Sequence, residues 1–328
     1  MGLVDRPGGR KSHIGVVPIV GGIAMYAGLM AGLSLLASSV ESLQSLCVAC
    51  TMLVAIGVID DKYPVPPGVR LLIQLAAILT MVYGADLALV SLGNPFGMGE
   101  VSLGPLSIIM TILVAVTGIN AYNLVDGADG LAGTMALIAL LALTYVGGLG
   151  SSSAAISLTL SAAVFGFLLF NFPTRWNRSV RTFMGDAGAT FLGFLIVWIS
   201  LSLSQGSGAV VSPVYCLWFA AVPIFDLFTC VVRRSLAGKS PFKPGRDHFH
   251  HTLKRGGMGV RQVLSILTGL QVVYAAVAIL AFRLGISEPV MFAAWVLLAA
   301  SQRSIICFIR RQSRIWGIRR KRSDPTVG

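Results

Sequence analysis

Ten apolar stretches separated by short polar segments constrain the fold of this chain more than any other feature of its sequence. Crossing a bilayer as a helix takes roughly 20 mostly apolar residues, and most of these stretches approach that length. Only 12% of the residues are charged, about half of the share that is usual in soluble domains. The chain is therefore predicted to be an all-α, polytopic integral membrane protein with one domain over residues 1–328 and about ten transmembrane helices. The predicted spans are residues 16–37, 43–59, 69–85, 106–119, 131–146, 154–170, 187–204, 209–232, 262–282 and 289–309.

The basic residues are unevenly distributed between the two sides of this layout. The chain has 25 Lys and Arg against 13 Asp and Glu, a net charge of +12. Nearly all the basic residues fall on one side, chiefly in the N-terminal segment 1–17, the loop 233–261 and the tail 310–328, whereas the other side holds only Arg283. Lys and Arg collect in the cytoplasmic loops of membrane proteins. Both termini and these loops are therefore predicted to be cytoplasmic, and the high charge requires no nucleic-acid partner.

A polar motif lies between the fourth and fifth spans, in Asn-Ala-Tyr-Asn-Leu-Val-Asp-Gly-Ala-Asp-Gly-Leu from Asn120 to Leu131. Asp126 and Asp129 are three residues apart, a spacing that would place both on one face of a helix. The two glycines would let another backbone or a ligand come close. A polar turn with capping aspartates would explain one Asp and one Gly, but not four polar side chains in ten residues. Carboxylates at the membrane edge are costly and indicate function.

Carboxylates from three distant parts of the chain are predicted to meet at the cytoplasmic surface. Asp60 and Asp61 end the second span, Asp126 and Asp129 follow the fourth, and Asp186 opens the seventh. Histidines and basic residues of the loop 233–261 lie on the same side. Mg²⁺ is usually held by one or two carboxylates plus substrate phosphates, and basic side chains bind phosphate oxygens. This combination predicts phosphoryl or diphosphate chemistry with magnesium at the membrane surface.

A zinc site is the competing interpretation of the histidines. The sequence His-Phe-His-His, from His248 to His251, contains no cysteine and does not have the spacing of an HExxH motif, which disfavours zinc. Cys47 and Cys50 form a CxxC pair inside an apolar span, with no His nearby. Such cysteines are better explained as small buried apolar residues.

Several motifs in order resemble the signatures of the polyprenyl-phosphate N-acetylhexosamine-1-phosphate transferases, the MraY/WecA superfamily. The loop from Ser240 to His251 is similar to the His-x-His-His loop of the WecA-type branch, whose members attach GlcNAc-1-phosphate to undecaprenyl phosphate. The MraY branch, which uses UDP-MurNAc-pentapeptide, has a different histidine motif, and it has Pro-Thr-Met-Gly-Gly where this chain has Pro-Ile-Val-Gly-Gly. The other matching pieces are Gly2-Leu-Val-Asp-Arg-Pro7, Arg10-Lys-Ser-His13, Pro18-Ile-Val-Gly-Gly22, Asp60-Asp61, the motif at 120–131 and Phe183-Met-Gly-Asp186.

The resemblance implies roles for the matching residues. Asp186 and Asn123 would hold Mg²⁺, or Mn²⁺ in its place. Asp129 and Phe183 would meet the uracil ring, although a core Phe at a helix start explains Phe183 equally well. The residues implied in catalysis are Asp60, Asp61, Asp126, Asp186 and His248, and the further substrate-binding residues are Lys11, His13, Asn123, Arg246, His250 and His251.

Two expectations concern positions outside these motifs. Pro223 in the eighth span is expected to kink its helix, and Asp226 behind it is expected to be a structural partner of Arg233 or Arg234. Members of this branch usually have one more span before the segment that starts at Gly2. The resemblance therefore implies either that this chain starts late or that it lacks that span.

The combined interpretation is a magnesium-dependent transferase in the bacterial inner membrane, with its active site facing the cytoplasm. It would transfer N-acetylhexosamine-1-phosphate from a UDP-sugar to undecaprenyl phosphate, release UMP and start a lipid-linked glycan. A homodimer is left open as its assembly. GlcNAc is the first choice of sugar, with GalNAc, QuiNAc and FucNAc left open. The alternatives are the MraY-type reaction, a cation-coupled transporter and a membrane scaffold. A transporter would place its carboxylates near the bilayer midplane on broken helices, whereas here they fall at span ends on one side.

Overall fold

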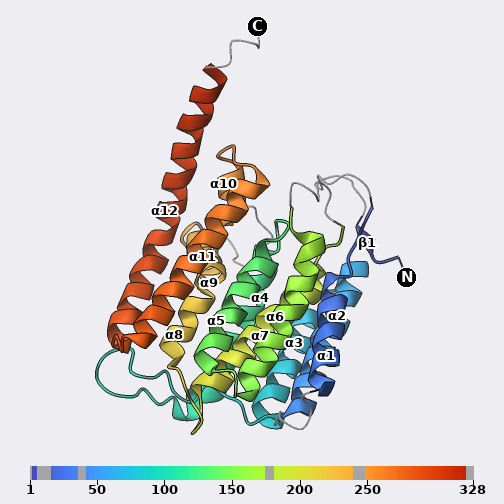
Figure 1. The fold of residues 1–328 in the computed structure, drawn as a ribbon, viewed down its shortest axis with the longest axis vertical. Coiled ribbons are helices and arrows are strands. Elements are labelled where there is room, and N and C mark those ends of the chain that lie inside the picture. The colour runs from blue at the N-terminus through green and yellow to red at the C-terminus, as the bar shows by residue number, and fades with distance from the viewer. Residues whose placement is uncertain (1, 6–15, 36–41, 174–180, 239–247, 323–328) are drawn as a thin grey trace.

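The computed structural model is a bundle of helices, and among the residues that it describes there is one two-stranded antiparallel pair (Figure 1). It describes residues 2–5, 16–35, 42–173, 181–238 and 248–322, with the side chains of the last helix described as far as residue 312. The elements in chain order are β1 (Val4–Asp5), β2 (Val17–Pro18), α1 (Gly21–Leu35), α2 (Leu43–Lys62), α3 (Pro67–Leu79), a π-helical turn (Thr80–Gly84), a 3₁₀ turn (Gly104–Leu106), α4 (Ser107–Val125), α5 (Leu131–Gly147), α6 (Ser152–Asn171), α7 (Gly185–Ser204), α8 (Pro213–Phe219), α9 (Ala221–Leu236), α10 (Phe249–Lys254), α11 (Val260–Arg283) and α12 (Glu288–Arg322).

The all-α membrane class predicted from the sequence is confirmed. Among the described residues, seven helices are long and apolar enough to cross a membrane, and the bent pair α8–α9 would make an eighth. Helices α1 and α5 are also apolar but shorter, with 15 and 17 residues. Every predicted span therefore contains an apolar helix, and the chain is a multi-pass membrane protein. The total of ten spans stays a prediction.

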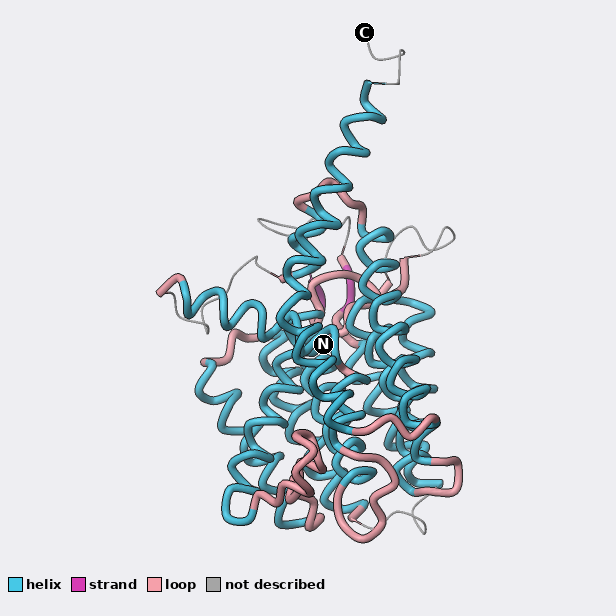
Figure 2. The backbone as a smooth tube through the Cα atoms, turned by 90° about the vertical axis from the view of Figure 1, so that its left-hand side faces the viewer, coloured by secondary structure: helices cyan, strands magenta, loops and turns pink. Residues whose placement is uncertain are grey.

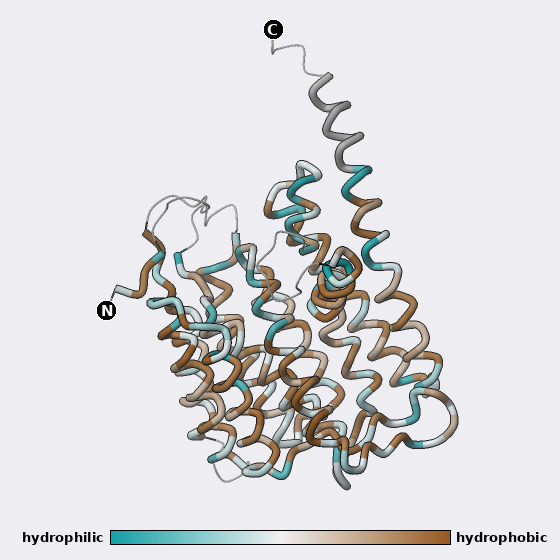
Figure 3. Tube along the Cα trace, turned by 180° about the vertical axis from the view of Figure 1, so that it is seen from behind, coloured by the Kyte–Doolittle hydropathy of each residue, from teal (hydrophilic) through white to brown (hydrophobic). Residues whose placement is uncertain are grey.

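Hydropathy divides the bundle along its long axis. Hydrophobic residues dominate the helical body, whereas hydrophilic residues gather at the end that carries α10, the β1 strand and the extension of α12 (Figure 3). Loops cap both ends of the bundle, and α12 continues well beyond it (Figure 2). The sequence of this extension is rich in Arg and Lys, so one end of the molecule is both polar and basic.

The eighth predicted span is broken into two helices rather than kinked at its proline. Helices α8 and α9 meet at 85°, and the break lies at Ala220. Pro223 falls in the first turn of α9, where a missing N–H costs no helical hydrogen bond. The buried Gln271 of α11 serves the groups freed by the break: its Oε1 accepts from the N–H of Val222 at 3.0 Å, and its Nε2 donates to the carbonyl of Phe219 at 2.7 Å. The side chain of Gln271 therefore stabilises the break between α8 and α9.

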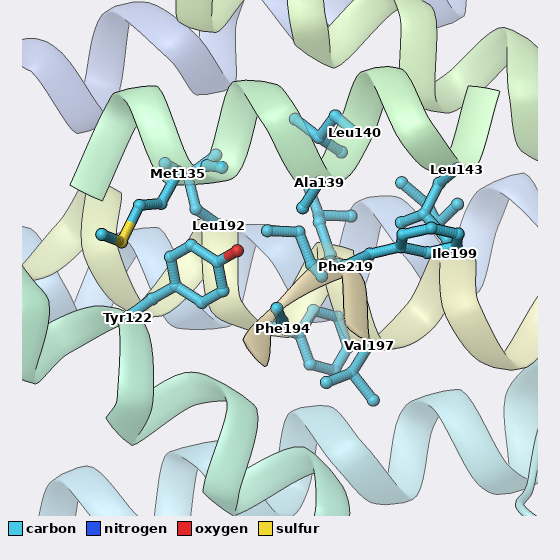
Figure 4. Packing of buried hydrophobic residues seen from close by; sticks show 14 of the residues in the cluster. Tyr122, Met135, Ala139, Leu140, Leu143, Leu192, Phe194, Val197, Ile199 and Phe219 are labelled. Carbon is cyan, nitrogen blue, oxygen red and sulfur yellow. The ribbon is translucent and has the colours of Figure 1, made fainter. Parts of the chain in front are cut away.

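Helix α7 lies at the centre of the bundle and packs against α1, α2, α4, α5, α6 and α8. It is apolar on all sides, and Leu192, Phe194 and Ile199 meet side chains of α4, α5 and α8 (Figure 4). Small residues allow helix backbones to approach closely in membrane proteins. Gly22 of α1 lies so close to Gly188 of α7 that a Cβ on Gly22 would stand 2.4 Å from the Gly188 nitrogen. The start of α7 is thereby held against its neighbours.

A set of backbone hydrogen bonds joins the segment 18–22 to the residues that precede α7. The N–H of Phe183 donates to the carbonyl of Pro18 at 2.9 Å, and the N–H of Gly21 donates back to the carbonyl of Phe183 at 3.0 Å. Gly22 likewise donates to the carbonyl of Met184 at 3.0 Å. The Pro-Ile-Val-Gly-Gly and Phe-Met-Gly-Asp motifs, about 165 residues apart in sequence, are therefore neighbours in space.

Candidate active site

Asp61, at the end of α2, caps the N-terminus of the central helix α7. Its Oδ1 accepts from the N–H of Asp186 at 2.8 Å, and its Oδ2 accepts from the N–H of Ala187 at 3.3 Å. The first N–H groups of a helix have no partner within the helix, and a carboxylate suits the positive end of its dipole. Gly185, at φ +72°, approaches this carboxylate so closely that a Cβ would overlap Oδ2. Asp61 therefore fixes the position of Asp186.

Asp60 and Asp186 are joined by an arginine. Nη1 of Arg70, in α3, lies 2.7 Å from Oδ2 of Asp60 and 3.2 Å from Oδ2 of Asp186. The other oxygen of Asp60 accepts from the N–H of Val65 at 2.7 Å. The other oxygen of Asp186 accepts from Nδ2 of Asn123 at 2.9 Å, a bond that leaves Oδ1 of Asn123 for a second partner. Four side chains from α2, α3, α4 and α7 thus meet at one point.

Arg70 was not among the site residues predicted from the sequence. The signal that could have found it is its position: it is the one cation in the first turns of an otherwise apolar span, ten residues after Asp60. A charge placed at the edge of the membrane needs a partner, and the nearest acidic residues in sequence are Asp60 and Asp61. The pairing with Asp186 could not have been read from the sequence, because 116 residues separate the two.

Asp126 and Asp129 lie in a turn between two helices, so the prediction that they share one helical face is wrong. Helix α4 ends at Val125, Asp126 is its C-cap, and Gly130 takes a left-handed φ of +77° just before α5 begins. Glycine adopts that conformation without steric cost. The turn is fixed by Asn171, whose Oδ1 accepts from the N–H of Gly130 at 2.7 Å.

The carboxylates of this region lie within electrostatic reach of one another. The pKa of Asp126 is well above its usual range, first because the carboxyl group is buried and then because Asp186, Asp129 and Asp61 are close. Crowded carboxylates resist ionising together unless a cation joins them. Carboxylate and amide oxygens are ligands that Mg²⁺ accepts. The residues present therefore fit a divalent cation, with the Arg70 guanidinium supplying the positive charge beside them.

The histidines form a second cluster that touches the carboxylate turn. His250 is buried against Gly127, where an added Cβ would lie 2.3 Å from Nε2 of the histidine. The rings of His250 and His251 have centroids 4.1 Å apart. Burial, followed by the charges of His251, His248 and Lys254, lowers the pKa of His250 to about 2, so this ring is neutral. Neither ring nitrogen of His250 has a hydrogen-bond partner in the described part of the chain.

The remaining predicted residues fall into three groups. Phe183 is half-buried just before α7, where its backbone bonds hold the 18–22 segment. Asp226 lies against His248, at 3.3 Å from Nδ1, in place of the expected Arg233 or Arg234. Lys11, His13 and Arg246 lie outside the described residues. The structure thus brings together Asn123, Asp60, Asp61, Asp126, Asp129 and Asp186, with His250 beside them, while the chemical role of each stays a prediction.

Comparison with known proteins identifies the family. A sequence model described as Glycosyl transferase family 4 matches residues 43–204, a range that contains Arg70, Asn123 and all five carboxylates of the site. The Undecaprenyl-phosphate alpha-N-acetylglucosaminyl 1-phosphate transferase of Escherichia coli (strain K12) is 36% identical over 284 residues, which is 86% of this chain and 77% of that protein. The chain belongs to glycosyl transferase family 4.

Other family 4 members of the same name extend this likeness. The protein from Yersinia pestis is 33% identical over 301 residues, covering 90% of this chain and 82% of the relative. The protein from Haemophilus influenzae is 33% identical over 314 residues, covering 91% and 84%. The resemblance inferred from the motifs is thereby confirmed at the level of the family.

Proposed function

We propose that this protein transfers GlcNAc-1-phosphate from UDP-GlcNAc to undecaprenyl phosphate and releases UMP. The observation that carries the proposal is the meeting of Asp60, Arg70, Asn123 and Asp186 at the ends of four helices in a chain of this family. Relatives that share 33–36% of their residues with it are named for transfer of GlcNAc-1-phosphate involving undecaprenyl phosphate. The polar and basic end of the bundle gives a water-soluble nucleotide access to a lipid acceptor held by the membrane.

Asp186, Asp60 and Oδ1 of Asn123 would hold the magnesium ion that such chemistry uses. When bound, the ion screens the negative charge of the diphosphate and stabilises the charge that builds as the phosphoryl group is transferred. Asp61 does not have to be a ligand, because both of its oxygens accept from backbone N–H groups that fix the start of α7. Oδ2 of Asp60 and both oxygens of Asp186 are instead bound by side chains, which can turn aside for an ion. The part of Asp61 is to keep the Asp186 backbone, and thus the Asp186 carboxylate, in place.

Arg70 and the histidines act on the phosphates. A cluster of carboxylates alone would repel two anionic substrates, so binding them requires compensating cations. Arg70 presents a planar guanidinium at the carboxylate cluster, and guanidinium groups bind phosphate oxygens in a bidentate manner. His250 adds a buried neutral ring beside the carboxylate turn, with nitrogen atoms suited to a hydrogen bond with the sugar phosphate.

The reaction is a single exchange at phosphorus. An oxygen of the lipid phosphate forms a bond to the β-phosphorus of UDP-GlcNAc, and the bond from that phosphorus to the bridging oxygen breaks, so UMP leaves with the electron pair. One diphosphate is replaced by another. We infer that this site faces the cytoplasm at the bacterial inner membrane, because the basic end of the bundle follows the positive-inside pattern. A homodimer stays a prediction, which hydrodynamic measurement tests.

The function is tested by transfer assays on purified protein. Undecaprenyl phosphate, Mg²⁺ and a panel of UDP-GlcNAc, UDP-GalNAc and UDP-MurNAc-pentapeptide are supplied separately, and UMP release is followed. We expect release with UDP-GlcNAc above the other donors. Asp186→Asn keeps the size of the side chain but removes its charge, and it should lower kcat by at least about 100-fold, because loss of a metal ligand removes several kcal/mol of transition-state stabilisation. Full activity of that variant, or release only with another donor, would contradict the assignment.

A further inference from the structure

The buried face of α9 holds a group of polar side chains whose roles the transfer mechanism does not explain. Asp226 and Cys230 lie one turn apart on α9, and both face His248. Nδ1 of His248 is 3.3 Å from Oδ2 of Asp226 and 3.4 Å from Sγ of Cys230. The three residues are only 2–5% exposed. Buried polar groups destabilise a protein unless they are hydrogen-bonded, so the mutual contacts of these three side chains stabilise their burial.

The Asp226 carboxylate fixes more than the ring. Its Oδ1 accepts from the N–H of Phe249 at 3.0 Å, and Phe249 is the first residue of α10, where backbone donors lack helical partners. One side chain therefore ties both the imidazole of His248 and the start of α10 to the membrane bundle. The next residue of α10 is His250, which contacts Gly127 in the turn between α4 and α5 that carries Asp126 and Asp129.

The groups around His248 favour its charged form. Its ring stacks on that of His250 at 6.0 Å and 7°, and it faces His251 at 6.5 Å from the same segment, while Asp226 and Cys230 face it from α9. Burial alone would lower the pKa of His248, but the hydrogen bonds to Asp226 and Cys230 outweigh it and raise the pKa to about 9. Since Nδ1 is turned to Asp226, Nε2 lies at the opposite edge of the ring, and in the charged form of the imidazole it is the second N–H donor.

We propose that Asp226 is a positioning residue: it holds His248 by Nδ1 and the adjoining backbone, so that the Nε2–H of His248 donates to a phosphate oxygen of the nucleotide sugar. The inference rests on the proposed function, since it assigns a substrate contact to that reaction. It makes His248 an electrostatic contact to the diphosphate and excludes the role of general base, because a ring that already carries both protons cannot accept another.

Asp226, Cys230 and His248 could also hold a metal ion, because their ligand atoms lie within 4.8 Å of one another. Structural zinc sites close their shell with four protein ligands. Among the described residues this group has three, and the stacked ring of His250 is 6.0 Å away. A hydrogen-bonded pair accounts for the 3.3 Å separation without an ion, so the positioning role is the better explanation and zinc is one outcome of its test.

Asp226→Asn tests the role without changing shape. Asn can still accept from the N–H of Phe249, but its NH₂ group donates where the carboxylate accepted, so Nδ1 of His248 must give up its proton. We expect KM for UDP-GlcNAc to rise about 10-fold or more, with KM for undecaprenyl phosphate unchanged, because only the nucleotide contact is lost. Cys216→Ala is the control from the other half of the broken pair: it removes a thiol that donates to the carbonyl of Ser200 and has no contact with His248 among the described residues, so both constants should stay within about twofold. Equal changes in both KM values for Asp226→Asn would indicate a merely structural role and overturn the proposal.

Two further measurements separate this inference from the proposed function. The chain has only four histidines, so ¹⁵N ring signals can be resolved and assigned with His248→Gln. We expect His248 to be doubly protonated at pH 7.5 in the natural protein and singly protonated in Asp226→Asn. This result does not depend on the identity of the sugar donor, so it can hold even if the proposed function fails. In a double-mutant cycle, Asp226→Asn should add nothing to the loss caused by His248→Gln. A singly protonated His248 in the natural protein, additive losses, or stoichiometric zinc that disappears in Cys230→Ala would each overturn the positioning role.

Discussion

At the residue scale, two adjacent aspartates have different tasks. Asp60 accepts from the N–H of Val65 with one oxygen and faces the Arg70 side chain beside Asp186 with the other, whereas both oxygens of Asp61 are taken by backbone N–H groups of α7. The sequence predicted both as one catalytic pair, since neighbouring residues of the same type cannot be distinguished without knowing what lies opposite them. Asp60 is therefore the member of the pair that is placed to act at the metal or the phosphate.

Arg70 provides a prediction at the same scale. Arg70→Gln removes the positive charge between Asp60 and Asp186, so the carboxylates will repel the anionic substrates more strongly. We expect kcat/KM for UMP release to fall about 100-fold, the size of effect seen when one electrostatic contact to a transition state is deleted. Arg283→Gln is the control, because that arginine lies over the ring of Tyr145 at the opposite end of α11 from the polar end of the bundle. Similar activities for the two variants would remove Arg70 from the site.

At the element scale, the site depends on how the start of α7 is held. Backbone bonds from 18–22 fix the residues just before the helix, Asp61 caps it, and Gly22 and Gly57 let α1 and α2 approach it. Asp186 lies in the first turn, where all of these contacts meet. A helix that is buried on every side transmits any displacement of its start directly to the carboxylate that it carries.

Gly22 is the position where this dependence can be measured. A Cβ at residue 22 would stand 2.4 Å from the nitrogen and 2.7 Å from the Cα of Gly188, and neither backbone atom can rotate away. Gly22→Ala should therefore destabilise the protein by about 1–3 kcal/mol, as overpacking does, and lower the transfer rate by shifting α7. Thermal unfolding in detergent and UMP release measure the two effects.

Gly166→Ala is the matched control for this change. It also adds one methyl group in a helix, but no atom of the described residues lies within 4 Å of the new Cβ. Ala is favoured over Gly in helices by about 1 kcal/mol, so the unfolding temperature should be unchanged or slightly higher. If Gly22→Ala behaved in the same way, the close approach of α1 and α7 would not matter for the site.

The elements themselves were largely predictable, because apolar runs of membrane length have few alternative structures. Each predicted span contains a helix, but the break at Ala220 was not expected, since its support comes from Gln271, about 50 residues further along the chain. The turn at Asp126 was mistaken for a helix because spacing alone does not show that Gly130 takes a left-handed conformation. Contacts between distant residues decided both cases.

At the scale of the whole molecule, the site lies where a membrane enzyme needs it. The residues that meet at Asp186 come from the ends of α2, α3, α4 and α7 on the polar side of the bundle. The lipid phosphate and the nucleotide can then reach the same point from two phases. That arrangement leaves two possible routes for the reaction: direct attack by the lipid phosphate, or prior attack by a carboxylate that releases UMP and leaves a covalent sugar phosphate on the enzyme.

We predict direct attack. The second pKa of a phosphate monoester is near 6, so most of the lipid phosphate is doubly ionised at pH 7 and needs no base. A carboxylate nucleophile would form a mixed anhydride of higher energy, and Asp60 is already engaged with Arg70 and the N–H of Val65. The test is isotope exchange: labelled UMP, unlabelled UDP-GlcNAc, Mg²⁺ and enzyme stripped of lipid phosphate should give no labelled UDP-GlcNAc. Adding undecaprenyl phosphate should start the exchange, because the near-balanced reaction can then run backwards. Exchange at full rate without the lipid would instead establish the covalent route, since only a covalent enzyme intermediate can return labelled UMP to the donor in the absence of an acceptor.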